Sequence, residues 1–337
     1  VSETVPAPVM SIPRWASAPL LYVCLGLSVL GVYLATMAPS LVWAHDGTDG
    51  GDFVTAAATS RVPHPPGFPV YLLISRIFVR VSQGQVARRV ICHVADGPAC
   101  DVARSMVPDP AKTTNLLSAV MATGTVLLVA AALRRHRVSR WAAGIAAATL
   151  GLAPWFWSQA LITEVYTTAA FFVALAVFLS EWAGDEAPHA AVAPGLALGL
   201  AVAVHPLAGF AAPFVVPGRR AAWGWFAAGG FVGLTPYLLL PLSGPWPQPW
   251  GDLTSVAGWW RYVTARFYWG NAFSLPFSQW PRRWSAWVVL MFRQFSPLGL
   301  LLVGVGMIRL WHDERGRAVR LLLALGAGSV YAIGYNS

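Results

Sequence analysis

Three aspartates stand within seven residues, directly after the first apolar run of the chain: Asp46, Asp49 and Asp52. A carboxylate at a membrane surface can act as a general base that takes the proton of an attacking hydroxyl group. Two other readings remain open. Asp49, with Asp52 three residues later, resembles the capping box of a short helix. The spacing could also supply oxygen ligands for calcium, although the Glu that closes an EF-hand loop is absent.

Glu164 is the second acidic candidate. It lies one turn into an apolar segment, behind the aromatic cluster Trp155-Phe156-Trp157. An ionisable residue within a membrane span is costly to bury, so its default interpretation is functional. The alternative is an ion pair with an arginine that holds helices together.

Two histidines and a second loop add further candidates. His205 precedes Pro206 between two apolar stretches, and His64 opens the turn His64-Pro65-Pro66-Gly67, where a structural role is the more common one. The Trp-rich segment 243–284 carries Asp252, with Arg261 and Arg266 five residues apart. These charges suit a polar ligand, but they also fit an ordinary interfacial helix.

The elements that must position these residues are membrane spans. Apolar runs long enough to cross a hydrocarbon core of about 30 Å lie near 16–43, 113–133, 141–158, 160–182, 221–242, 285–308 and 318–335. Between 192 and 217, two shorter apolar halves flank His205-Pro206, and each makes only roughly 15–20 Å of helix. This region forms either one long broken span or a hairpin with His205 at its tip.

The arginine distribution favours the hairpin. The basic segments 134–140, 309–320 and Arg219-Arg220 are the candidates for cytoplasmic loops. All three lie on one side of the membrane only if 192–217 enters and returns on that side. The loops 45–112 and 243–284 are then outside, and Asp46–Asp52, Glu164 and His205 share one level. This coincidence is the strongest sequence argument for a site there.

The first outer loop is predicted to hold two short helices. Residues 49–60 form one, and residues 66–81 form an interfacial helix from which Arg76 and Arg80 reach toward water. Residues 82–111 are predicted to be an irregular insertion. This insertion contains Cys92 and Cys100, which could form a disulfide if the loop faces the periplasm.

Composition excludes a soluble globular protein. Hydrophobic residues make up 56% of the chain and charged residues 11%, against about 25% charge in soluble domains. The net charge of +9 fits cytoplasmic loops and anionic membrane lipids better than nucleic acid. We therefore predict an all-α polytopic protein of a bacterial inner (cytoplasmic) membrane. Residues 1–337 form a single transmembrane domain, and a further C-terminal part remains open because the chain stops as a span emerges.

Several short motifs, in this order, resemble a known family. They are Asp49-Gly50-Gly51-Asp52, His64-Pro65-Pro66-Gly67-Phe68-Pro69, Asn115–Ala119, Glu164-Val165-Tyr166, Pro236–Leu242 and the run Trp250–Tyr268. The chain is similar to the GT-C superfamily of membrane glycosyltransferases. Its closest resemblance is to the protein O-mannosyltransferase-like family long catalogued as a domain of unknown function. Asp52 stands where that family has Glu, two extra residues precede Asp49, and 82–111 is longer than the family's loop.

The resemblance implies a GT-C-type helical bundle with juxtamembrane helices and an inverting glycosyltransferase activity. A sugar, mannose in the first place, would move from a polyprenyl-phosphate carrier to a hydroxyl of a protein or glycan at the periplasmic face. The carrier phosphate is a competent leaving group, so one carboxylate base suffices, whereas glycosidases also need an acid. Neither a cofactor nor a metal is expected.

The same resemblance suggests residue roles. Asp49 is the expected base, with Asp52 second. Arg261, Arg266 and His205 are candidates to stabilise the phosphate, and Glu164 with Tyr166 would hold the acceptor or orient the loop. Asp46, His64 and Asp252 complete the expected substrate-binding set.

Two other functional classes remain as alternatives. A membrane transporter or lipid flippase would also place Glu164 and His205 within the bundle. It should show inverted repeats or paired broken helices, and the sequence has one broken region. A scaffold protein would need no clustered carboxylates.

Overall fold

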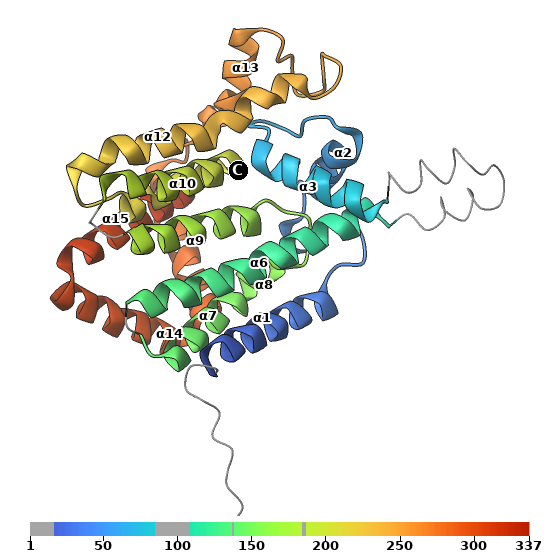
Figure 1. Ribbon diagram of the computed structural model, residues 1–337. Helices are drawn as coiled ribbons and strands as arrows, with labels where there is room; N and C mark the ends of the chain where they lie inside the picture. The colour runs from blue at the N-terminus through green and yellow to red at the C-terminus, as the bar shows by residue number, and fades with distance from the viewer. Residues whose placement is uncertain (1–16, 85–107, 137, 184–186, 337) are drawn as a thin grey trace, which may run out of the picture.

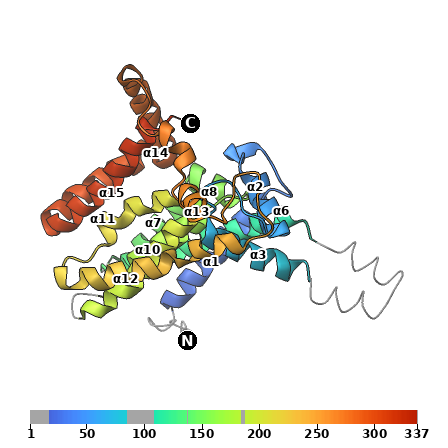
Figure 2. The same ribbon diagram turned by 90° about the horizontal axis from the view of Figure 1, so that it is seen from above.

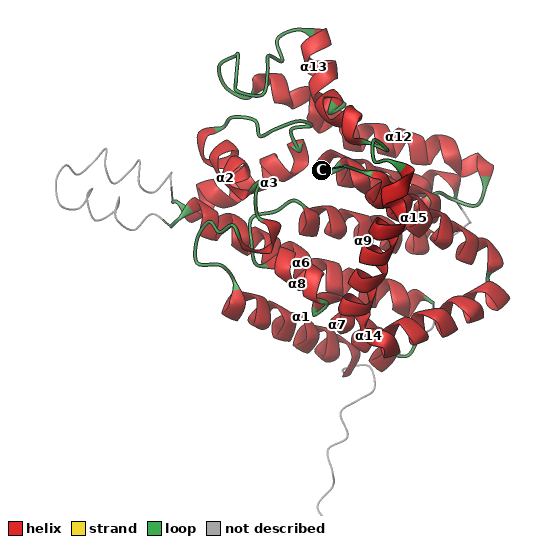
Figure 3. Ribbon diagram, turned by 180° about the vertical axis from the view of Figure 1, so that it is seen from behind, coloured by secondary structure: helices red, strands yellow, loops and turns green. Residues whose placement is uncertain are grey.

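The computed structural model describes residues 17–84, 108–136, 138–183 and 187–336. Within these ranges the chain consists of helices and connecting loops, without a strand (Figure 3). Five described helical segments are long and apolar enough to cross a membrane: Pro110–Arg135, Tyr166–Ala183, Arg220–Leu242, Phe277–Asp313 and Arg315–Gly334. The prediction of an all-α polytopic membrane protein is confirmed.

The centre of the molecule is a bundle of helices packed side by side (Figure 1). Its members are α1 (Ser17–Thr36), α6 (Pro110–Arg135), α9 (Tyr166–Ala183), α10 (Val192–Val204) and α12 (Trp223–Leu234). Helices α10 and α12 touch through their backbones: a Cβ on Gly195 would lie 2.0 Å from the carbonyl oxygen of Phe226. Small residues permit this close approach, which replaces the hydrophobic effect as a packing force within lipid.

The predicted span 141–158 is broken. Helix α7 (Arg140–Gly151) ends before Pro154, and a short helix α8 (Pro154–Ala160) follows, because proline has no N–H to continue the ladder. Helix α9 then starts only at Tyr166. The expectation that Glu164 lies inside a span is therefore wrong; it lies in the loop between α8 and α9.

Side chains of α6 hold that loop in its non-helical form. Thr163 Oγ1 donates to Asn115 Oδ1 at 2.7 Å and pairs with Thr114 Oγ1 at 2.6 Å. The Leu161 carbonyl accepts from Ala38 N at 3.1 Å. The Leu161 carbonyl is a group that a continuous helix would have paired internally, and the Thr163 bonds fasten the loop to α6.

Residues 192–217 form the predicted hairpin. Helix α10 ends at Val204, His205 is extended (φ −154°, ψ 126°), and η3 (Pro206–Ala211) and α11 (Ala212–Val215) follow. Pro194, in the first turn of α10, and Val215, at the end of α11, line the same cavity. The segment therefore returns to the end from which it started, as the charge argument required.

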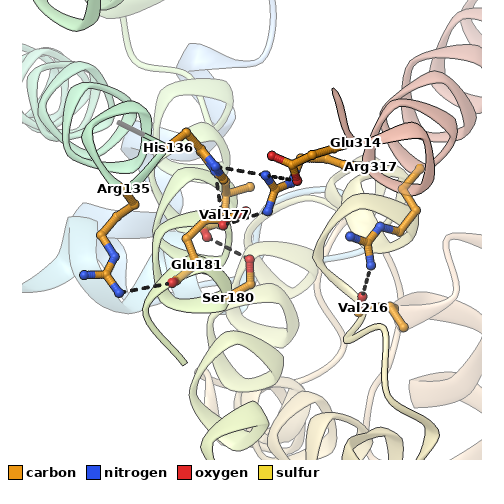
Figure 4. Close-up of polar contacts among 9 residues, drawn as sticks. Arg135, His136, Val177, Ser180, Glu181, Val216, Glu314 and Arg317 are labelled. Carbon is orange, nitrogen blue, oxygen red and sulfur yellow. Dashed lines mark hydrogen bonds and ion pairs between the residues drawn. The ribbon is translucent and has the colours of Figure 1, made fainter. Parts of the chain in front are cut away.

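The three basic segments meet at that end of the bundle (Figure 4). Arg317 binds Glu181 at the end of α9, Arg135 donates to the Glu181 carbonyl, and Arg320 reaches the Val216 carbonyl. Arg317 and Arg320 belong to α15 (Arg315–Gly334), which follows α14 (Trp280–Asp313). Seen from above, these two helices form an arm at one side of the bundle (Figure 2).

The short helices α2 (Gly50–Thr59) and α3 (Pro69–Ser82) lie at the other end of the bundle (Figure 1). Their bounds agree closely with the two helices predicted for this loop, 49–60 and 66–81. Arg80 is exposed, as expected, whereas Arg76 is half-buried, and both guanidinium groups also bind polar atoms of the protein. Arg76 Nη2 donates to the Arg61 carbonyl at 2.6 Å, and Arg80 Nη2 donates to Ser60 Oγ at 3.2 Å. Both arginines thus tie α3 to the turn after α2. Cys92 and Cys100 lie outside the described residues, so their disulfide stays a prediction.

Candidate active site

The carboxylates of Asp49 and Asp52 flank the imidazole of His64. Asp52 Oδ2 accepts two hydrogen bonds, from the His64 backbone N–H at 2.6 Å and from Nδ1 at 2.9 Å. Because a carboxylate only accepts, Nδ1 carries the proton. The other ring nitrogen, Nε2, faces Asp49 Oδ2 at 3.7 Å.

This geometry excludes the capping box. Asp49 precedes α2, but its side chain makes no capping hydrogen bond, and Asp52 bonds His64 instead of the Asp49 backbone. The Asp49 side chain is 48% exposed, against 30% for Asp52. Asp49 is therefore the carboxylate that an incoming substrate can reach.

The turn after Pro63 fixes His64. Gly67 N donates to the His64 carbonyl at 2.9 Å, and Gly67 has a φ of +91°. A Cβ at this glycine would lie 2.9 Å from atoms of both Leu240 and Tyr262. Glycine is thus required for the backbone conformation and for the close approach of η5 (Thr235–Leu242) and α13 (Val256–Val263).

Aromatic rings enclose the imidazole. Phe68 and Phe53 lie 5.0 and 5.5 Å from the His64 ring centroid, and Trp250 lies 5.9 Å away. Trp250 Nε1 also points to Asp52 Oδ1 at 3.5 Å. The Tyr262 hydroxyl donates to the Pro63 carbonyl. The second outer loop therefore closes over the first and joins the same site.

Glu164 lies behind this cluster and is buried. Burial, followed by the negative charge of Asp49, raises the pKa of Glu164 to about 8. The carboxyl group therefore carries a proton at neutral pH. This acid lies close to the more exposed carboxylate, Asp49. Burial raises the pKa of Tyr71, and Glu164, once ionised above its own pKa, raises it further.

His205 forms the floor of the site. Its ring stacks on Phe68 at 5.8 Å and lies 5.5 Å from the ring of Tyr166. Burial, with His64 nearby, lowers the pKa of His205 to about 4, so the imidazole is neutral at neutral pH. Nδ1 accepts from Leu207 N at 3.3 Å, which leaves Nε2 as a hydrogen-bond donor. His205, a candidate to stabilise the phosphate, thus offers a neutral donor and not a cation.

The remaining candidates lie further out. Asp46 ends η1 (Ala44–Asp46) with a φ of +60°. Asp252 Oδ1 accepts from Thr254 N and Oγ1, at 2.9 and 2.7 Å, and these bonds lower the pKa of Asp252. Asp252, Arg261 and Arg266 line an outer polar hollow of about 570 Å³, together with Trp250. The structure thus brings Asp49, Asp52, His64, Glu164, Tyr166 and His205 together, and places the other candidates around the rim.

A second hollow, of about 870 Å³, lies on the other side of α13 and is lined mainly by apolar and aromatic side chains. Its lining includes Leu238, Trp259, Trp260, Tyr268 and Trp269. Tyr268 connects it to the acidic site, since its ring lies 6.5 Å from that of His64. The Arg266 guanidinium lies over the Trp269 ring at 5.9 Å, so this cation borders both hollows.

The sequence reasoning missed Tyr71. Its side chain is fully buried beneath α2, and its hydroxyl has no hydrogen-bond partner among the described residues. Its ring contacts Phe53 at 5.2 Å. The apolar stretch of α3 gave a signal for burial but none for a polar neighbour, because that neighbour is Glu164, distant in sequence.

No group of three His, Cys, Asp or Glu side chains suited to a metal ion occurs in the described ranges. The absence of a metal requirement stays a prediction. What the arrangement offers is an exposed carboxylate, a fixed imidazole, a protonated buried acid, and an apolar hollow next to them.

Comparison with known proteins gives a family model and a relative that carry the same protein name. A family model described as "Protein O-mannosyl-transferase TMEM260 N-terminal domain" matches residues 49–217. The chain is also 23% identical, over 322 residues, to the "Protein O-mannosyl-transferase tmem260" of Dictyostelium discoideum. That match covers 86% of this chain and 36% of the relative, so the chain spans about a third of the relative's length. No solved structure matches the chain.

Proposed function

The chain belongs to the family of the protein O-mannosyl-transferase TMEM260 N-terminal domain, and from this premise we propose that it is an inverting glycosyltransferase. It transfers a sugar, most simply mannose, from a polyprenyl-phosphate carrier to a hydroxyl group of a protein or glycan. The observation that carries the proposal is that the two aspartates have different roles. Asp52 hydrogen-bonds His64, and the Asp49 side chain remains exposed to an incoming substrate.

Asp49 is the proposed general base. The acceptor hydroxyl oxygen forms a bond to the anomeric carbon, and its proton passes to the Asp49 carboxylate. The bond from that carbon to the phosphate oxygen breaks, and its electron pair leaves with the polyprenyl phosphate. Attack from the face opposite the phosphate inverts the configuration. The reaction needs no metal, because the leaving group is stable as an anion.

The donor lipid is proposed to occupy the apolar hollow. Its polyprenyl chain would lie against Trp259, Trp260 and Leu238, which gain from burying apolar surface. Arg266, at the border of the two hollows, would stabilise the phosphate charge. Tyr268 then lies between the lipid and the acidic pair, where the sugar would be placed.

Glu164, Tyr166 and His205 are proposed to bind hydroxyl groups of the sugar or the acceptor. Protonated Glu164 and the Nε2–H of neutral His205 are donors, and a sugar presents several acceptor oxygens. Tyr71, whose hydroxyl has no partner among the described residues, lies behind them as a third donor.

The orientation follows from charge. The acidic site and the basic segments lie at opposite ends of α6, which begins near Thr163 and ends at Arg135. If the basic end is cytoplasmic, the site faces the periplasm of a bacterial cytoplasmic membrane. Helices α2 and α3 then form the juxtamembrane part of a GT-C-type bundle, which supports the same proposal.

The direct test is single-turnover transfer by the purified protein in detergent, with radiolabelled polyprenyl-phosphate mannose and a hydroxyl acceptor. The proposal predicts label in the acceptor and an equal amount of free polyprenyl phosphate. A carrier protein gives a different result: label crosses liposome membranes while the donor stays intact. That outcome would replace the enzyme with the transporter or flippase alternative.

A further inference from the structure

A cavity of about 190 Å³ lies at the basic end of the bundle, remote from the acidic site. The ends of α9 and α11, the first turn of α10 and the start of α15 form its wall. Its charged lining residues are Glu181, Arg219, Arg317 and Arg320. Glycosyl transfer as proposed above makes no use of this cavity.

Two acidic side chains in the described part of this end, Glu181 and Glu314, are already engaged (Figure 4). Glu181 Oε2 lies 3.1 Å from both Arg317 Nη2 and His136 Nε2, and Glu314 Oε2 lies 2.6 Å from Arg317 Nη1. His136 Nδ1 lies 2.9 Å from Arg317 Nη1, and since a guanidinium only donates, Nδ1 accepts. The two carboxylates therefore compensate Arg317.

Among the described residues, no carboxylate compensates Arg320 in this way. Its Nη1 reaches only the Val216 carbonyl, at 3.5 Å, and its Nε is buried without a partner within the described part of the chain. A Cβ on Gly218 would lie 3.7 Å from Nη1, so the glycine leaves this side of the guanidinium open. An unpaired buried donor on a charged group is costly unless a ligand satisfies it.

We propose that this cavity binds a phosphate group, with Arg320 as its main ligand and Arg219 at the rim. A phosphate matches the planar fork of arginine by charge-assisted bonds. The source is either the headgroup of an anionic lipid or a free phosphate compound. Occupation would fasten α15, and with it the α14–α15 arm, to the ends of α10 and α11.

The test is thermal unfolding of the purified protein in detergent, titrated with phosphatidylglycerol, phosphatidylcholine or inorganic phosphate. Wild type should be stabilised by phosphatidylglycerol or by phosphate, and Arg320→Gln should weaken the apparent Kd about tenfold. Arg309→Gln is the matched control, because Arg309 is an exposed arginine at the same end, paired with Asp313. It should bind as wild type does.

Gly218→Leu provides a second variant that keeps Arg320 and fills the cavity. It should also weaken binding, which separates loss of the site from loss of a single charge. Stabilisation by phosphatidylglycerol alone identifies a lipid headgroup, and equal stabilisation by inorganic phosphate identifies a free phosphate ligand. Equal binding by wild type, Arg320→Gln and Gly218→Leu, or equal stabilisation by phosphatidylcholine, would overturn the proposal.

Discussion

A single oxygen of Asp52 accepts both the backbone N–H and the Nδ1–H of His64, at 2.6 and 2.9 Å. This bond pair fixes the imidazole in position and tautomer, and it turns Nε2 toward Asp49. The two aspartates of the motif Asp49-Gly50-Gly51-Asp52 thus have different roles. One positions a neighbour, and the other remains available to a substrate.

Asp52 and His64 should therefore behave as one unit. Asp52→Asn and His64→Ala should each lower kcat by roughly 10²-fold, since displacement of an oriented group by about 1 Å has that effect. The double variant should be little worse than either single one, because both changes break the same interaction. Asp313→Asn, at an exposed aspartate at the basic end of the bundle, is the control and should keep the wild-type kcat. Additive losses in a double-mutant cycle would show that the two residues act separately.

Gly67→Ala should destabilise the protein by about 1–3 kcal/mol. The added Cβ meets Leu240 and Tyr262, and φ is +91°. Gly84→Ala is a matched control, since Gly84 has a φ of +53° but nothing within 4 Å of its Cβ position. This control should lower the free energy of unfolding only by the strain of a positive φ at alanine. The comparison uses thermal unfolding in detergent, and equal losses in both variants would remove the packing argument.

Glu164 should make stability depend on pH. Its pKa rises from an ordinary 4.5 to about 8 on folding, so between these values the folded state binds more protons than the unfolded chain. This contribution to the free energy of unfolding is complete below about pH 4.5, declines as the pH rises, and is lost above about pH 8.

Glu164→Gln should flatten that decline. At pH values above about 8, the thermal unfolding midpoint of this variant should be higher than that of wild type. Glu314→Gln, which removes a half-exposed carboxyl group, should leave the decline in place. Midpoints measured from pH 5 to pH 9 test the prediction. An unchanged slope in Glu164→Gln would mean that Glu164 is already ionised in the folded protein.

Trp260→Ala should weaken donor binding. Trp260 lines the apolar hollow yet is 57% exposed, so its removal costs little packing and mainly takes away lipid contact. KM for a long-chain polyprenyl-phosphate sugar should rise roughly 10-fold, with kcat unchanged. KM for a short water-soluble donor should not move. Trp225→Ala, at an exposed tryptophan on α12 outside the hollow, is the control, and a KM change there would argue against a specific groove.

Hydrophobic length and arginine placement were enough to predict the helical class, the 192–217 hairpin and the gathering of the basic segments. These features follow from the thickness of the bilayer and from charge, which act on the chain locally. Breaks within apolar runs were harder to predict. The loop that carries Glu164 exists because Thr114, Asn115 and Ala38 bind its polar groups, and such partners are set by tertiary packing.

The acidic motif shows the same limit. Its spacing suited a helix cap, and only the fold reveals that Asp52 turns to His64, twelve residues later. Arg76 and Arg80 had the spacing of exposed interfacial cations, yet they bind the turn after α2. A polar side chain is satisfied by whichever partner the fold brings near, and periodicity carries no information about that partner.

The central claim is that Asp49 is the base, and transfer by Asp49→Asn tests it most directly. Mannose transfer from radiolabelled polyprenyl-phosphate mannose should fall by about 10²–10⁴-fold in this variant, with wild-type unfolding behaviour and an unchanged KM for donor. Transfer at the wild-type rate by a folded Asp49→Asn protein would contradict the account, because the carboxylate proposed to take the proton would then be dispensable.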